Sequence, residues 1–204
     1  MRIGLDFDNT IIRYDDVFAT AAKARGLLGA EFSGTKQQVR DAIRLLPNGE
    51  IEWQKLQGYV YGAGIGGAEP FPGLESFLLR ARKEGAHVLI VSHKTIYGHF
   101  DPERVNLREA ALGWLEARGY FSAGRYGLRR EDVYFGETRA EKLARIAEVS
   151  PDLFIDDLEE VLDDPDFPSG VRRLLFSENP PEGAPYPAYP NWRAIEGSLF
   201  DVNA

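Results

Sequence analysis

Short apolar segments that suit buried strands alternate with amphipathic helices along most of this chain. In the first segment, residues 1–10, Ile3, Leu5 and Phe7 are apolar. The other strands are predicted at 87–91, 132–135, 153–155 and 171–176, and helices at 72–84, 101–118 and 139–148. Strands and helices that alternate at this spacing form βαβ units, whose right-handed crossovers cover both faces of a parallel sheet. The sequence therefore predicts an α/β fold with a Rossmann-like three-layer core.

Residues 14–70 show a different pattern, in which apolar residues recur at helical spacing and no strand is evident. Thr35 is the expected N-cap of one helix, whose apolar face holds Val39, Ala42, Ile43 and Leu46. We therefore expect a small all-helical insertion over 14–70, within a core formed by residues 1–13 and 71–204.

Residues 62–67 match the dinucleotide fingerprint G-x-G-x-x-G letter for letter. The fingerprint requires a strand before it and a helix after it, so that the helix N-terminus can bind a pyrophosphate. Here a predicted helix comes before and Glu-Pro-Phe-Pro comes after. We interpret this segment as a flexible hinge of the insertion.

Residues 178–190 are rich in proline and glycine, and 187–190 fit the P-x-x-P ligand pattern. Trp192 and Ile195 follow directly, and both residue types favour burial. We therefore expect a loop that wraps the core.

Composition narrows the function classes. The chain has 204 residues, of which 44% are hydrophobic and 27% charged, as is typical of a globular protein. Its net charge of -8 argues against binding of a nucleic acid polymer, and the absence of cysteine excludes thiolate chemistry. Neither a membrane-spanning apolar run nor a signal-peptide pattern is evident. We expect a cytoplasmic protein that does not bind membranes.

Polar side chains gather where the predicted strands end. Asp6 and Asp8 follow the first strand, Ser92 the second, and Asp156 and Asp157 the fourth. Ligands of open parallel sheets bind outside the carboxyl ends of the strands. Carboxylates in this number repel one another unless a cation lies between them, and a site of oxygen ligands suits Mg²⁺.

A lysine and a hydroxyl point to an anionic ligand at the same edge. Lys142 lies on the helix that leads into the fourth strand, and Ser92 supplies the hydroxyl. Lys94, which also follows the second strand, is a rival for the cationic role. A phosphoryl group fits, because its transfer depends on positioning and on neutralising its oxygens with a metal ion and lysine.

These residues resemble the motifs of the haloacid dehalogenase (HAD) superfamily. The first motif is similar to residues 6–10, the second to 88–92, the third to Lys142 and the fourth to 153–157. Their order, spacing and placement at strand ends agree with the family over residues 1 to about 160. In the family, an insertion after the first motif is a mobile cap, so 14–70 would be a helical cap.

The resemblance implies a role for each residue. Asp6 would be the nucleophile that forms an aspartyl-phosphate, and Asp8 would protonate the leaving oxygen and then deprotonate water. Lys142 would bind phosphoryl oxygens and keep Asp6 ionised. Dehalogenases lack an acid at the position of Asp8, so dehalogenation is disfavoured.

The remaining implied roles concern the metal ion and the phosphate. The Mg²⁺ ligands would be Asp6, the backbone carbonyl of Asp8, and Asp157, with Asp156 binding directly or through another ligand. The substrate phosphate would be bound by Ser92 and Lys142, with Asn9, Thr10 and His93 as further candidates.

The sequence thus predicts a Mg²⁺-dependent phosphomonoesterase for small soluble metabolites, with sugar phosphates first and nucleoside monophosphates second. Two alternatives stay open: a phosphomutase of the same superfamily, and a catalytically idle binding module on this fold. An idle module has no physical need for a carboxylate cluster that destabilises it, which argues against the second. The sequence leaves the oligomeric state open.

Overall fold

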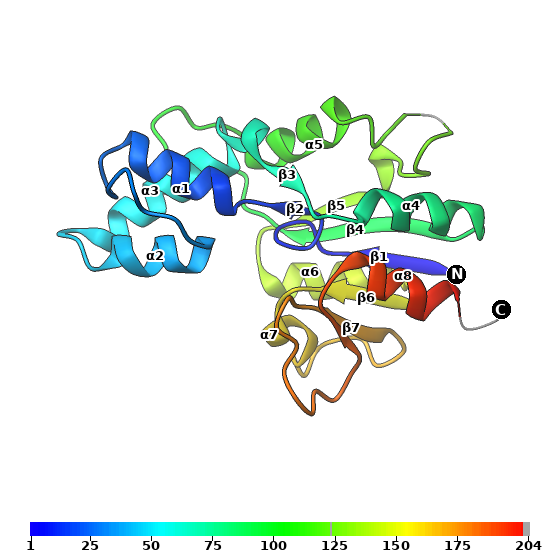
Figure 1. Ribbon diagram of the computed structural model, residues 1–204. Coiled ribbons are helices and arrows are strands. Elements are labelled where there is room, and N and C mark those ends of the chain that lie inside the picture. Colours follow the sequence, from blue (N-terminus) through cyan, green and yellow to red (C-terminus); the bar gives the residue numbers. More distant parts are fainter. Residues whose placement is uncertain (123, 202–204) are drawn as a thin grey trace. The chain divides into compact units, whose positions relative to one another are not determined.

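The computed structural model describes residues 1–122 and 124–201. Its main sheet has six strands in the order β5-β4-β1-β6-β7-β8, and neighbouring strands run parallel. The strands are β1 (Arg2–Leu5), β4 (His87–His93), β5 (Val133–Gly136), β6 (Leu153–Asp156), β7 (Arg172–Phe176) and β8 (Ala188–Tyr189). Strand β1 lies between β4 and β6 (Figure 1). The predicted α/β core with a parallel sheet is confirmed.

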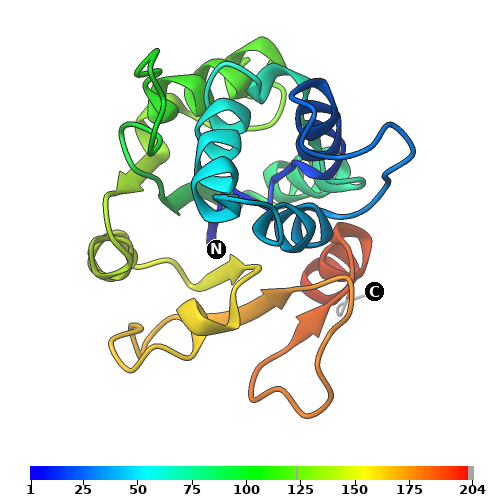
Figure 2. The ribbon, with the colours of Figure 1, turned by 90° about the vertical axis from the view of Figure 1, so that its left-hand side faces the viewer.

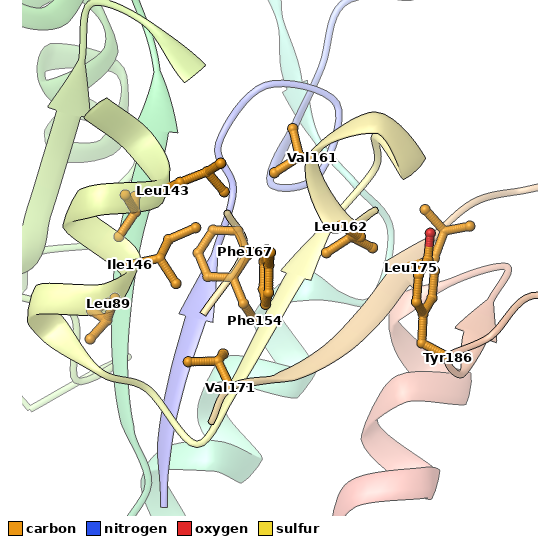
Figure 3. Packing of buried hydrophobic residues seen from close by; sticks show 11 residues of the cluster. Leu89, Leu143, Ile146, Phe154, Val161, Leu162, Phe167, Val171, Leu175 and Tyr186 are labelled. Carbon is orange, nitrogen blue, oxygen red and sulfur yellow. The ribbon is translucent and has the colours of Figure 1, made fainter. Parts of the chain in front are cut away.

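Helices cover both faces of this sheet. They are α4 (Leu74–Lys83), α6 (Arg139–Val149), α7 (Glu159–Leu162) and α8 (Trp192–Phe200), and a short 3₁₀ helix, η2 (Arg130–Asp132), precedes β5. On one face, Leu143 and Ile146 of α6 pack against Phe154 of β6 in a buried apolar cluster (Figure 3). On the other, Phe77 of α4 contacts Trp192 of α8, with ring centroids 4.7 Å apart. Figure 2 shows α6 and α8 on opposite sides of β6.

The chain divides into two compact units. The α/β unit comprises residues 1–12, 70–94 and 116–204, and the helical unit comprises 13–69 and 95–115. The chain changes units within β2 (Ile12–Arg13) and β3 (Glu69–Pro70), which pair with each other in a two-stranded sheet. Within the described residues, no helix is long and apolar enough to cross a membrane.

The helical unit has an aromatic core. Its helices are α1 (Asp15–Ala24), α2 (Lys36–Arg44), α3 (Gly49–Tyr61), the 3₁₀ turn η1 (Ile65–Gly67) and α5 (Leu107–Ala117), of which residues up to Leu115 belong to the unit. Phe18 stacks on Trp53 with centroids 4.9 Å apart, and Tyr61 packs edge-on against Phe18. Thr35 caps α2 as predicted, because its hydroxyl accepts a hydrogen bond from Gln38 N.

Segment 95–115 belongs to the helical unit, whereas the predicted boundaries placed it in the core. Trp114 Nε1 donates a 2.9 Å hydrogen bond to the carbonyl oxygen of Ala68. A Cβ atom on Gly98 would lie 2.5 Å from the Cα of Gly58, so the two backbones meet without side chains between them. These contacts join residues more than thirty positions apart, which periodicity does not reveal.

The helix predicted at 101–118 begins later, at Leu107. The carboxylate of Asp101 accepts hydrogen bonds from the backbone N–H groups of Glu103 and Val105, which closes a separate turn. The side chain of Asn106 then accepts from Arg108 N and caps the helix. The predicted helix start at position 101 is therefore wrong, because Asp101 closes the turn that precedes the helix.

Two irregular segments were predicted, at 62–67 and at 178–190. Residues 62–67 lie inside the helical unit and include η1 at 65–67, while the chain changes units at 69/70. Their role as a hinge stays a prediction. The segment predicted as a loop at 178–190 contains β8, which pairs with β7 through Leu175 N to Pro187 O and Ser177 N to Tyr189 O.

Candidate active site

A tight turn after β1 carries the first two acids. The carbonyl oxygen of Phe7 accepts hydrogen bonds from the N–H groups of Ile11 and Ile12. Asn9 is left-handed with φ of 57°, a conformation that asparagine tolerates better than most residues. The indole of Trp192 donates a 3.0 Å hydrogen bond to the carbonyl oxygen of Thr10. The turn therefore holds Asp6 and Asp8 at the carboxyl end of the central strand.

Lys142 joins two of the predicted acids. Its Nζ donates to Asp6 Oδ1 and to Asp156 Oδ2, each at 2.6 Å, and all three side chains are buried. The other oxygen of Asp156, Oδ1, accepts from Leu158 N at 3.0 Å. Three elements thus meet here: β1, β6 and α6.

The connection between β5 and α6 places Lys142 next to Asp6 and Asp156. Thr138 caps α6, since its hydroxyl accepts from Glu141 N. Gly136 ends β5, and a Cβ atom on it would lie 2.8 Å from the backbone nitrogen of Lys142. A residue without a side chain is therefore required for α6 to begin this close to the strand.

Burial and neighbouring charges shift the pKa values of both Asp6 and Lys142. Burial raises the pKa of Asp6, Lys142 lowers it, and Asp156 and Asp8 raise it again, so that it lies at about 7 instead of 3.8. Burial would lower the pKa of Lys142, but Asp156 and Asp6 raise it above its ordinary value. One ammonium cannot fully compensate two buried carboxylates, and the group is short of positive charge.

Asp157 completes a set of oxygen ligands. Asp6, Asp156 and Asp157 each offer a carboxylate oxygen, and these atoms lie within 4.8 Å of one another. Thr10 Oγ1 donates to Asp157 Oδ1 at 3.4 Å. Oxygen ligands in this number, next to a shortage of positive charge, fit a hard divalent cation.

Ser92 and His93 follow each other at the end of β4 but differ in environment. Ser92 is fully buried, and its hydroxyl makes no hydrogen bond within the described residues. A buried hydroxyl without a partner is unfavourable and needs an explanation such as a ligand. His93 is exposed, and its Nε2 hydrogen-bonds the carbonyl oxygen of Glu137 at 2.9 Å.

Lys94 forms a second ion pair, with Asp8, which the sequence pattern did not predict. Its Nζ lies 3.0 Å from Asp8 Oδ1 and 2.8 Å from Asp8 Oδ2. The only signal in the sequence was its position two residues after Ser92, which puts both side chains on one side of an extended strand. The two lysines therefore serve different acids: Lys142 contacts Asp6 and Asp156, and Lys94 contacts Asp8.

No protein-family model matches this chain, and no curated protein matches it. Several solved structures are similar to this chain. A HAD-superfamily hydrolase of subfamily IA, variant 1, from Geobacter sulfurreducens is 13% identical with a TM-score of 0.57, covering 97% of this chain and 95% of that one. A predicted phosphatase from Clostridium acetobutylicum is 12% identical with a TM-score of 0.56, covering 98% of each chain.

CbbY from Rhodobacter sphaeroides, in complex with phosphate, is also similar, with 12% identity, a TM-score of 0.52 and coverage of 95% of each chain. These likenesses extend over nearly the whole of this chain. The chain therefore has the fold of HAD-superfamily hydrolases, and the expectation of that fold is confirmed.

Proposed function

We propose that this protein is a Mg²⁺-dependent phosphomonoesterase that acts through an aspartyl-phosphate on Asp6. The observation that carries the proposal is the buried group in which Lys142 bridges Asp6 and Asp156, with an oxygen of Asp157 beside them. Phosphoryl transfer needs a positioned nucleophile and positive charge for the phosphoryl oxygens. Here a carboxylate can serve as the nucleophile, and the lysine and a metal ion bound by the further oxygen ligands can supply the charge. The unpartnered hydroxyl of Ser92 supports a ligand with oxygen atoms.

Two displacements make up the reaction. In the first, an oxygen of Asp6 attacks phosphorus, the bond from phosphorus to the ester oxygen breaks, and Asp8 donates a proton to the departing oxygen. In the second, Asp8 takes a proton from a water molecule that attacks the aspartyl-phosphate, releasing inorganic phosphate and restoring Asp6. Lys142 orients Asp6 and balances charge on the phosphoryl oxygens.

Asp6, Asp156 and Asp157 would hold the metal ion, together with the backbone carbonyl of Asp8. A bound Mg²⁺ would supply positive charge for the phosphoryl oxygens and favour the ionised form of Asp6. Ser92 and Lys142 would bind the phosphate, and Asn9, Thr10 and His93 remain candidates beside them.

The substrate we propose is a small soluble phosphomonoester, with sugar phosphates ahead of nucleoside monophosphates. The phosphate bound to CbbY, a protein of the same fold, supports a phosphorylated ligand. A panel of hexose phosphates, nucleoside monophosphates and a phosphorylated peptide should show the highest kcat/KM on one of the two small classes. A requirement for a sugar bisphosphate activator would instead indicate a phosphomutase.

Asp6→Asn tests the proposal directly. Hydrolysis of an aryl phosphate should require Mg²⁺, stop in EDTA, and be abolished by Asp6→Asn, which keeps the shape of the side chain but removes its nucleophilic charge. Asp16→Asn is the matched control, because Asp16 is an exposed aspartate of the helical unit and should leave the rate unchanged. Equal activity of wild type in EDTA, or of Asp6→Asn, would contradict the proposal.

A further inference from the structure

Lys94 is held both at its backbone and at the end of its side chain. Its backbone nitrogen donates a 2.9 Å hydrogen bond to the carbonyl oxygen of Gly136, which ties it to the end of β5. Its ammonium contacts both oxygens of Asp8 and lies 5.6 Å from the ring centroid of Phe7, within range of a cation–π interaction. The side chain therefore has little freedom to turn elsewhere.

The ion pair is unequally exposed. The Lys94 side chain is 3% exposed, whereas the Asp8 side chain is 20% exposed. A buried ammonium that loses its anion is strongly unfavourable, because desolvation is no longer compensated. Lys94 thus contacts Asp8 from a buried position, while part of the Asp8 side chain stays accessible.

From this geometry we infer that Lys94 is a positioning residue for proton transfer by Asp8, and that it does not bind the phosphoryl group. Contact with both oxygens sets the rotation of the ionised carboxylate, the form of Asp8 that takes the proton from water. When Asp8 carries the proton for the leaving oxygen, Lys94 donates to the carbonyl oxygen of the acid and leaves the O–H free to point at the substrate. Lys142 acts on Asp6 and Asp156, so the two lysines have separate tasks. The inference rests on the proposed function, because it assigns Asp8 the proton transfer of that reaction.

Lys94→Met tests the inference, because methionine keeps the unbranched stem and removes the charge. Misplacement of a catalytic group can lower rates by about a hundredfold, so kcat on an alkyl phosphate should fall by about 10- to 100-fold. An aryl phosphate with an acidic leaving group needs little proton donation, and its kcat should fall by about threefold or less. Lys94→Arg should restore part of the loss, because guanidinium also contacts a carboxylate through two hydrogen bonds.

A double-mutant cycle separates positioning from a general structural effect. In an Asp8→Asn background, Lys94→Met should lower the alkyl phosphate rate by about twofold or less, since residues that act as a unit are not additive. Lys83→Met, at an exposed position of α4, is the matched control and should leave both rates unchanged. Melting temperatures of all variants show whether each protein is folded under the assay conditions.

Three results would overturn the inference: equal losses on both substrates, a full additional loss in the Asp8→Asn background, or no loss on the alkyl phosphate. Equal losses would place Lys94 on the phosphoryl group instead. If Asp6→Asn keeps its activity in the same assay, the proposed function fails. If Asp6→Asn is inactive and Lys94→Met behaves like wild type, only the role of Lys94 fails.

Discussion

At the level of single residues, the carboxylate of Asp6 lies in an environment that opposes its charge. It is buried with Asp156, and both carboxylates share the ammonium of Lys142. Burial and the neighbouring acids raise its pKa to about 7, and the ammonium only partly opposes them. The same residue is the proposed nucleophile, and strong shifts of this kind are common at functional sites.

The raised pKa predicts a pH-dependent stability in protein kept free of metal by EDTA. The ordinary pKa of the Asp6 carboxyl group is 3.8, and in the folded chain it is about 7. At a pH between these two values, the folded state holds the proton and the unfolded state does not. The stability that this proton contributes is fully present below the lower value and is lost as pH rises through the upper one. Melting temperatures should be measured at several pH values between these two pKa values and above the higher one. With rising pH, they should fall less steeply for Asp6→Asn than for wild type.

Adding Mg²⁺ should reduce the same slope in wild type, because the ion would favour the ionised carboxylate. Asp16→Asn should keep the wild-type slope, since its carboxylate is 89% exposed. Identical slopes for wild type and Asp6→Asn would show that Asp6 does not titrate in this range.

Among the elements, the junction of β5 and α6 matters most for the site. Gly136 ends the strand, Thr138 caps the helix, and Lys142 lies one turn into it. The position of the lysine ammonium therefore depends on how closely α6 can begin to the end of β5.

Gly136→Ala is expected to lower both stability and activity. The added Cβ would lie 2.8 Å from Lys142 N and 3.0 Å from Glu141 Cβ, so α6 has to move away. Overpacking of this kind destabilises by about 1–3 kcal/mol. The displaced Lys142 should also lower kcat on an aryl phosphate. Chemical denaturation and steady-state kinetics measure the two effects.

Gly113→Ala is the matched control within a helix. A Cβ atom on Gly113 would meet no atom within 4 Å, and alanine in a helix interior is about 0.5–1 kcal/mol more favourable than glycine. This variant should be slightly more stable and fully active. A Gly136→Ala protein with wild-type stability would show that the junction adapts without moving the helix.

At the scale of the whole molecule, the helical unit is assembled from two separate parts of the chain, 13–69 and 95–115. Trp114 contacts Ala68 through a hydrogen bond, Gly98 meets Gly58, and a Cβ on Gly62 would lie 3.1 Å from Val105. The expected insertion of 14–70 therefore covers only part of this unit.

This arrangement predicts the outcome of two deletions. Replacing 14–68 alone with a short Gly-Ser linker should give a protein that aggregates, because buried apolar residues of 95–115 lose the segment that they pack with. Replacing both 14–68 and 96–114 should restore a larger monomeric fraction. Size-exclusion chromatography measures the monomeric fraction of the two deletion variants, and binding of a hydrophobic dye measures their exposed apolar surface. Equal monomeric fractions would contradict the discontinuous unit.

Features that depend on neighbouring residues were predictable from the sequence. Apolar runs bounded by helices located the parallel strands, and the acids that end β1 and β6 followed from the same runs. Thr35 was predicted as a cap from its place before a segment of helical periodicity, and its partner in the structure, Gln38, lies only three residues away. The edge of the sheet that holds the candidate site was predictable because all parallel strands end at one side.

Contacts between distant residues were not predictable in this way. The pairing of Lys94 with Asp8 spans 86 positions, and the contact of Trp192 with Thr10 spans 182. Strand β8 has two residues, too few for a periodic pattern, and exists because β7 offers it an open edge. Periodicity reports the face on which a side chain lies, whereas its partner is selected by the packing of the folded chain.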